Sequence, residues 1–248
     1  MIETLTPGIL IYLMAAAFFT AILHSIGGFA GALLLSIAIS PVIGIKITVP
    51  LVAVVMVVSH GMRAMVFRDR VDWKIFALIF CVAFPFILLG VYTYVGLSEA
   101  GVGLFLGTML LITLPLRRYL KNREIKLPRA AIGMVAIPYG FLSGASFGVG
   151  LILGPILLGT GMSGQTLIAT LAVQGFMLNL IKAVAFGLSP LLGFREIALG
   201  IVLGLCTFPG HYVGRRIVAR AGNASHVIVL EGVMALGALY FISRWFIN

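Results

Sequence analysis

Charged residues are scarce in this chain. Asp, Glu, Lys and Arg make up 10% of its 248 residues and 61% are hydrophobic, whereas a soluble domain carries roughly 25% charged residues. Apolar stretches of about 18 residues or more, the length that a transmembrane helix needs, recur along the chain. The alternating short segments of a membrane β-barrel are missing. The composition therefore excludes an ordinary soluble domain and predicts an all-α polytopic membrane protein.

Acidic residues are the rarest of the charged ones. Seven Asp and Glu stand against 17 Lys and Arg, which gives a net charge of +10. In a soluble protein this balance could indicate nucleic-acid binding. Here the basic residues cluster between apolar segments, where they set the orientation of membrane helices. We therefore expect the lipid bilayer and a small solute as partners, and no nucleic acid.

The chain also lacks the usual motifs of enzymes, metal sites and ATP-driven pumps. Its cysteines, Cys81 and Cys206, lie in apolar tracts, and its four histidines show no metal-ligand spacing. Neither a Walker A motif nor a dinucleotide fingerprint is present. The N-terminus lacks the positive region of a signal peptide, because Glu3 is the only charged residue before Lys46. We expect no cofactor, no metal and no enzymatic activity.

A glycine-rich stretch occurs twice, each time inside a long apolar tract. Gly27–Gly31 lies in the tract 8–40 and Gly144–Gly150 in the tract 130–159. As one helix, the first tract would be about 50 Å long, too long for a bilayer core of about 30 Å and too short for two full crossings. A hairpin of two short limbs fits better. Interrupted segments at matching positions indicate a transporter's binding site; the alternative is that the glycines only let helices pack closely.

Three further apolar spans follow each interrupted tract. They are predicted at 47–67, 75–95 and 100–116 in the first half and at 165–187, 197–214 and 226–246 in the second. The chain therefore divides into two membrane domains, 1–120 and 130–248, joined by a basic linker at 121–129. The halves align at an offset of 119 residues. The residues matched at this offset are Gly31 with Gly150, His60 with Asn179, and Arg63 with Lys182.

The basic residues favour hairpins over single crossings for the interrupted tracts. If each tract returns to its own side, the loops 68–74, 117–129 and 215–220 share one side and hold twelve of the 17 basic residues. The positive-inside rule makes that side cytoplasmic. Each half then has three full crossings plus a hairpin, and an odd number of crossings inverts the second half. We predict two inverted repeats in the cytoplasmic (inner) membrane, with both termini outside the cytoplasm.

Three features of the chain recur in one known family: the two glycine motifs, the loop Arg68–Trp73 that ends in Val71-Asp72-Trp73, and the layout in two halves. Through these features the chain resembles the sulfite exporter TauE/SafE family over nearly its whole length. The chain departs from that family at Ser36, where a proline would fall, and at Gly193-Phe194-Arg195, which stands in place of a second Val-Asp-Trp. The resemblance implies a secondary transporter that exports small sulfur-containing anions such as sulfite or organosulfonates. Two alternatives stay open: a transporter of another solute, and a membrane accessory subunit that does not transport.

Anion transport needs positive potential and hydrogen-bond donors inside the membrane, and helix N-termini provide both. Breaks at the glycine-rich stretches would create such N-termini near the bilayer midplane. The glycines expected to bind substrate through their backbone are Gly27, Gly28, Gly31, Gly144, Gly148 and Gly150, and the expected hydroxyl donors are Ser25, Ser36, Ser143 and Ser146. The alternative for each serine is a hydroxyl bonded back into its own helix.

Arg63 and Lys182 lie within predicted spans, where a charge is costly and indicates function. Each is four or five residues from a span end, so the alternative is a side chain that extends to the membrane surface. Matched positions in inverted halves would place the two near opposite faces. Asn179 lies one turn from Lys182, and we count all three residues as candidates for substrate binding.

Three ionisable residues within apolar tracts could carry a coupling proton: His24, His60 and Glu231. Histidine changes its charge near neutral pH. The alternative for each histidine is a side chain packed and hydrogen-bonded between helices, and Glu231 could instead pair with a basic residue. His211, which follows Pro209, is expected at the membrane interface near the basic side.

Overall fold

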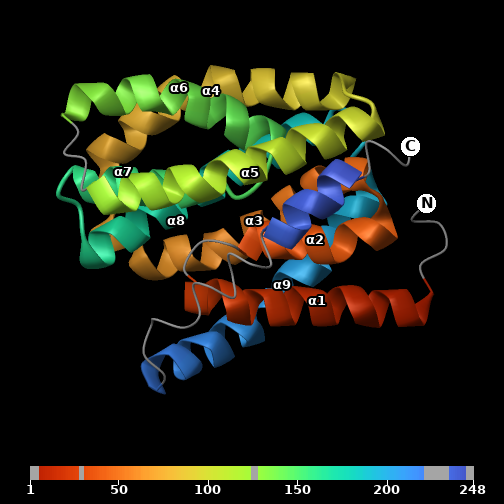
Figure 1. Ribbon diagram of the computed structural model, residues 1–248. Coiled ribbons are helices and arrows are strands. Elements are labelled where there is room, and N and C mark those ends of the chain that lie inside the picture. The colour runs from red at the N-terminus through yellow and green to blue at the C-terminus, as the bar shows by residue number, and fades with distance from the viewer. Residues whose placement is uncertain (1–5, 28–30, 124–127, 221–234, 244–248) are drawn as a thin grey trace.

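The computed structural model describes residues 6–27, 31–123, 128–220 and 235–243, and in these ranges it contains helices and short connections but no strand (Figure 1). Five of the described helices are long and apolar enough to cross a membrane. The prediction of an all-α polytopic membrane protein is therefore confirmed.

Each half consists of a helical hairpin followed by long helices. The first half contains α1 (Pro7–Gly27), α2 (Gly31–Ile43), α3 (Ile45–Phe67), the short 3-10 helix η2 (Arg68–Arg70), α4 (Trp73–Gly96) and α5 (Glu99–Arg123). The second contains α6 (Arg129–Ala145), α7 (Gly150–Gly159), α8 (Gly164–Gly187), α9 (Phe194–Arg220) and the helical residues 235–243. Five predicted spans fall within α3, α4, α5, α8 and α9. The sixth, 226–246, is described only at 235–243.

The interrupted tracts form hairpins, as predicted, but their limbs are unequal. α1 has 21 residues and α2 has 13, while α6 has 17 and α7 has 10. At about 1.5 Å per residue, α1 is about 31 Å long, so this limb is long enough to cross the bilayer core alone and is not short. No glycine or proline lies between Gly8 and Gly27 to end the helix earlier.

α5 extends into the segment predicted to be the linker. It ends at Arg123 and α6 begins at Arg129, so the first residues of 121–129 are helical. No glycine or proline lies between Pro115 and Pro128, and the residues between them are compatible with a helix. Residues 121–123 of the predicted linker are therefore helical, and residues 124–127 lie outside the described residues.

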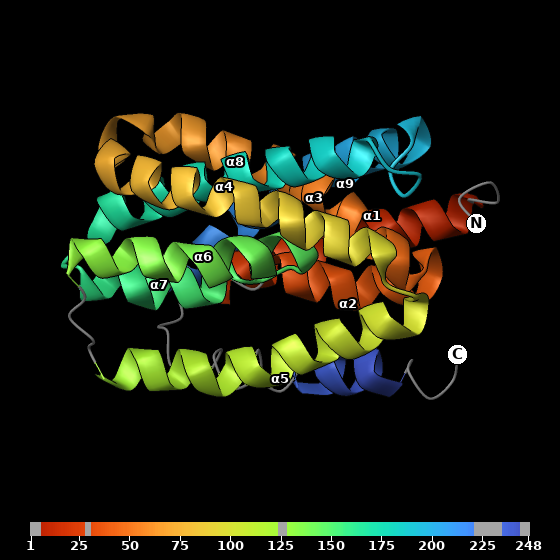
Figure 2. The same cartoon turned by 90° about the horizontal axis from the view of Figure 1, so that it is seen from above.

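The predicted register of the two halves recurs in the helix starts. α2 begins at Gly31 and α7 at Gly150, and α3 begins at Ile45 and α8 at Gly164, so both pairs start 119 residues apart. The packing is reciprocal: α1 packs on α9, α6 packs on α4, and α3 packs on α8 in the layer between them (Figure 1 and Figure 2). These pairings support inverted repeats, which stay a prediction.

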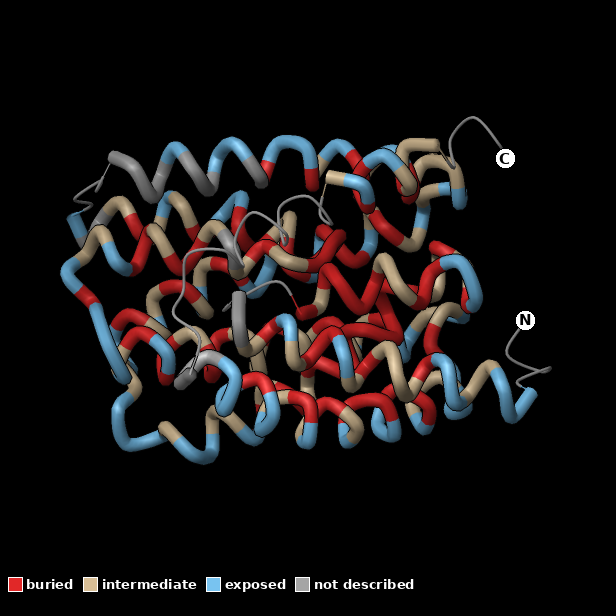
Figure 3. The backbone as a smooth tube through the Cα atoms, turned by 60° about the horizontal axis from the view of Figure 1, so that its bottom comes forward, coloured by how far each residue is buried: buried red, intermediate tan, exposed pale blue. Residues whose placement is uncertain are grey.

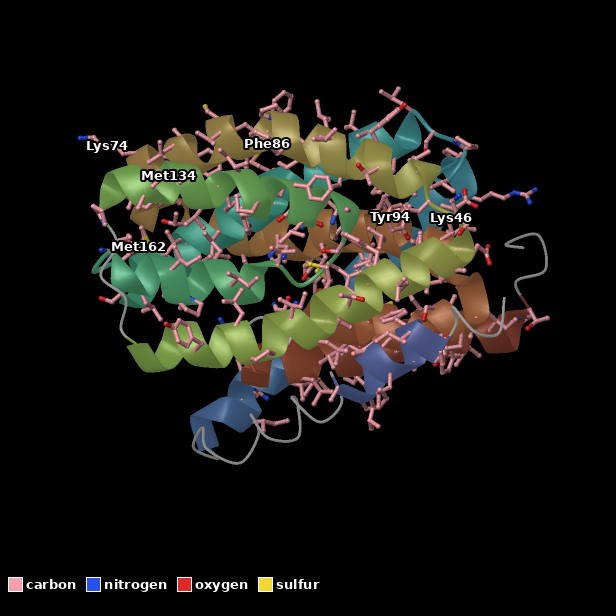
Figure 4. All side chains as sticks on the ribbon, turned by 45° about the horizontal axis from the view of Figure 1, so that its top comes forward. Lys46, Lys74, Phe86, Tyr94, Met134 and Met162 are labelled. Carbon is pink, nitrogen blue, oxygen red and sulfur yellow. The ribbon has the colours of Figure 1, made fainter. Side chains whose placement is uncertain are left out.

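The connections between helices lie at two opposite ends of the bundle. The α3–α4 and α7–α8 connections lie at one end, and the α2–α3, α4–α5 and α8–α9 connections at the other (Figure 1). Lys74 and Lys46 mark these two ends in Figure 4. The last turns of α9, with the exposed Arg215 and Arg216, lie at the same end as Lys74. The basic connections therefore gather at one end, as the charge pattern predicted.

Burial is greatest in the middle of the bundle (Figure 3). α3 is the most buried of the five long apolar helices, and its Leu51 and Val55 side chains are fully covered. The buried Tyr94 ties α4 to the start of α3, because its hydroxyl donates to the Ile45 carbonyl oxygen at 3.1 Å. α3 is thus the central helix of the bundle, and the two hairpins lie around it.

Two pairs of helices pack backbone against backbone through glycine. Gly140 and Gly144 of α6 lie against α4, and a Cβ at Gly144 would overlap the Ile87 carbonyl oxygen. Gly210 and Gly214 of α9 lie against α1 in the same way. Small residues let membrane helices approach this closely. Gly144, one of the glycines expected to bind substrate, therefore has the surroundings of a helix-packing residue.

Gly144→Ala is expected to destabilise the protein, because the added Cβ meets the α4 backbone and the two helices must separate. Overpacking of this kind typically costs about 1–3 kcal/mol, which a lower melting temperature in nanodiscs would report. Gly187→Ala is the matched control, since nothing lies within 4 Å of a Cβ at Gly187. Equal melting temperatures for the two variants would contradict the close contact.

Candidate functional site

A cavity of about 100 Å³ lies where both hairpins meet α3 and α8. Its polar lining residues are His24, His60, Arg63, Tyr139, Ser143, Ser146, Asn179 and Lys182. Its apolar lining residues include Val52, Met56, Phe147 and Leu171. None of the described lining residues is acidic. The cavity therefore combines positive charge and hydrogen-bond donors with an apolar wall.

The break between α6 and α7 forms one side of the cavity. Ser146 is extended, with φ −147° and ψ −168°, and Gly148 has a φ of +79°, a conformation that glycine adopts without steric cost. No side chain caps the start of α7, and Gly148, Val149 and Gly150 line the cavity. A helix N-terminus of this kind favours an anion.

The break between α1 and α2 is closed by a histidine. The Gly31 N–H, at the start of α2, donates to His24 Nδ1 at 2.9 Å, and a Cβ at Gly31 would meet the His24 ring. Gly27 is the last residue of α1. Gly28 lies outside the described residues. The Gly31 amide, which was expected to bind substrate, therefore already has a partner.

Arg63 and Lys182 both line the cavity, although they were expected near opposite faces. The Arg63 guanidinium lies 3.0 Å from His24 Nε2, and Lys182, which is 5% exposed, donates to the Ser146 carbonyl oxygen at 2.8 Å. Long side chains account for the difference, because each can reach inward by more than a helical turn. The single ion pair among the described residues joins Arg68 to Asp69, so no described carboxylate neutralises either charge.

His60 and Asn179, the other matched pair, also line the cavity. His60 Nδ1 is buried and has no hydrogen-bond partner among the described residues, and its ring lies against Gly175. The Asn179 side-chain amide donates to the Gly175 carbonyl oxygen at 2.7 Å, within its own helix. The imidazole is thus the less satisfied of the two groups.

The four predicted serines separate into two groups. Ser143 and Ser146 line the cavity, and the Ser146 hydroxyl donates to the Leu142 carbonyl oxygen at 2.6 Å. The Ser36 hydroxyl likewise donates within its own helix, to the Ala32 carbonyl oxygen at 2.6 Å. Ser25 instead contacts α9. Two of the four hydroxyls are therefore bonded back into their own helices.

Glu231, the third candidate for carrying a coupling proton, lies outside the described residues.

Tyr139, Met56 and Phe147 line the cavity and were not predicted. His211 was expected at the membrane interface, but its ring contacts Ser25 of α1 and Ser59 of α3, and its centroid is 5.3 Å from that of His24. Its place inside an apolar tract was a usable signal, since an ionisable residue in a span indicates function. No signal in the sequence, however, indicated that α9 packs on α1.

These features define a class of protein: a polytopic helical membrane protein with a cation-lined cavity between two interrupted hairpins. The model of the sulfite exporter TauE/SafE family matches residues 13–241, nearly the whole chain. The chain therefore belongs to this family, a family of membrane transporters of sulfur-containing anions. A transporter family is consistent with the expectation that the chain is not an enzyme. No curated protein and no solved structure matches the chain.

Lys182→Met is expected to raise the melting temperature of the protein in the absence of substrate. A charge inside a membrane costs about 2.5–3.5 kcal/mol on insertion scales, and Met removes this cost while filling a similar volume. The control is Lys74→Met at an exposed position, which should leave the melting temperature unchanged. If Lys182→Met melts at a lower temperature, the bond to Ser146 stabilises the fold and the prediction is wrong.

Proposed function

We propose that this chain is a secondary transporter that exports small sulfur-containing anions, such as sulfite or organosulfonates, across the cytoplasmic membrane. The observation that carries the proposal is the meeting of Arg63 and Lys182 in one cavity without an acidic residue among the described lining. Cation sites in proteins use carboxylates and carbonyls, so this lining favours an anion. Membership of the family supports the substrate class.

Each part of the cavity has a role in holding such an anion. Arg63 and Lys182 supply positive charge, and the uncapped start of α7 supplies oriented backbone dipoles. Ser143 and Asn179 are the proposed side-chain partners of the anion's oxygens. The apolar wall excludes water, which strengthens the attraction between opposite charges, and it faces the organic group of a sulfonate.

The packing of the hairpins suits alternating access. α1 packs on α9 and α6 packs on α4, so each hairpin is attached to the opposite half. Rocking of these units around α3 and α8 would open the cavity to one face and then to the other. In this proposal each moving unit pairs a hairpin with a helix of the opposite half, so it combines segments of the halves 1–120 and 130–248, which the linker 121–129 joins. The end that carries Lys74 faces the cytoplasm, and both termini lie on the other side.

Uptake of radiolabelled sulfite into proteoliposomes, with unlabelled sulfonates, thiosulfate and sulfate as competitors, tests the proposal. We expect accumulation that selected sulfur anions inhibit, and the ranking of competitors identifies the preferred substrate. If folded protein moves none of these anions under a pH or voltage gradient, the proposed function is wrong. Co-purification of a stoichiometric partner would then indicate an accessory subunit.

Arg63→Gln and Lys182→Gln are each expected to reduce sulfite transport by about 10–100-fold, because a hydrogen bond to a charged group is worth about 1.5–3 kcal/mol. Initial rates in proteoliposomes at equal protein density give the comparison. Lys74→Gln, at an exposed position outside the cavity, is the matched control and should transport at the wild-type rate. Full activity in either cavity variant would remove that residue from the proposed site.

A further inference from the structure

We propose that His211 takes up a proton when the anion binds, and that this residue couples anion transport to protons. The inference rests on the proposed anion site. His211 lies on α9, outside the lining of the main cavity, and its ring is held between α1 and α3.

Both ring nitrogens of His211 contact serine hydroxyls. Nδ1 lies 2.9 Å from Ser25 Oγ on α1, and Nε2 lies 2.9 Å from Ser59 Oγ on α3. A hydroxyl both donates and accepts, so the neutral ring can donate to one serine and accept from the other. The protonated ring can donate to both. The Ser25 hydroxyl can then turn to the His211 carbonyl oxygen, which is 3.5 Å away. His211 therefore gains a proton without a change of partners.

The other two described histidines of the cluster lack this property. His24 Nδ1 accepts from the Gly31 N–H, and Nε2 faces the Arg63 guanidinium. Both neighbours are donors only, and a protonated His24 would present an N–H to each of them. His60 Nδ1 has no partner among the described residues. Of the three, His211 alone has an acceptor within reach of each nitrogen.

His24 and Arg63 connect this site to the anion cavity. The His24 and His211 ring centroids are 5.3 Å apart, and the Arg63 guanidinium lies 3.0 Å from His24 Nε2. A second cavity of about 10 Å³, roughly one water molecule in size, lies between the two histidines and is bordered by the Thr20, Ser59 and Thr207 side chains. His24 therefore lies close to both Arg63 of the anion cavity and His211.

The groups around His211 explain why proton uptake at His211 and anion binding in the cavity favour one another. α1 contributes Ser25 and His24, α3 contributes Ser59 and Arg63, and no carboxylate is among the described contacts of the ring. The positive charge of Arg63 opposes a second positive charge at His211. An anion bound beside Arg63 offsets that repulsion and favours the protonated ring. Linkage then requires the proton to strengthen anion binding by the same factor.

Proton uptake during sulfite binding tests this inference. Calorimetric titrations of the protein in nanodiscs, in buffers with different ionisation enthalpies near about pH 6.5, count the protons taken up per anion. Sulfite itself exchanges a proton in this range, but equally in every variant. We expect the wild type to take up about one proton more per anion than His211→Gln. Tyr212→Phe, at the exposed neighbouring position, is the control and should match the wild type.

Ser59→Ala provides a second variant that keeps the imidazole. It removes one acceptor of the protonated ring, so proton uptake should persist but move to a pH about one unit lower. If His211→Gln binds sulfite with the wild-type proton count, or if it does not fold and Ser59→Ala leaves the pH profile unchanged, the inference is overturned and the anion site stands. If the wild type binds no sulfite at any pH, the proposed function fails, and the inference fails with it.

Discussion

The bilayer core offers no water to buried charges or to unpaired backbone groups, so these must gather where protein surrounds them. The packing of α3 against α8 creates that place. There Arg63 of α3 lies against His24 of α1, and Lys182 of α8 donates to the Ser146 carbonyl oxygen at the end of α6. Two positive charges then share one cavity without a carboxylate among the described lining residues. Their mutual repulsion falls when a negative charge enters, so the architecture is one that an anion stabilises.

Glycine contacts outside the central α3–α8 pair attach the hairpins to the rest of the bundle. α6 lies backbone to backbone against α4, and α9 against α1, so each hairpin is attached to a helix of the opposite half. A hairpin cannot move alone without breaking that contact. Motion that opens the cavity must therefore carry a hairpin and its partner helix together. The same contacts that stabilise the fold thus limit how it can change shape.

Hydropathy and glycine placement predicted the helices, the hairpins and the register of the halves, because these depend on local sequence and on the thickness of the membrane. The site was only partly predictable. Lys182 could equally have extended to the membrane surface, since its position near a span end fits both outcomes. Gly144 gave no sign that it faces α4, because sequence does not show which helix a glycine contacts. His211 was expected at the membrane interface because its partners, Ser25 and Ser59, belong to helices far away in the chain and could not be predicted.

The two hairpins occupy matching positions in the two halves, but different groups lie at the breaks between their helices. His24 closes the start of α2, whereas the start of α7 has no side-chain cap and lines the cavity. In the proposed transport cycle, an anion held at the open helix end would therefore lie nearer one hairpin than the other. Its routes to the two membrane faces would pass different side chains, so inward and outward passage would be distinct processes and not mirror images, despite the repeated architecture.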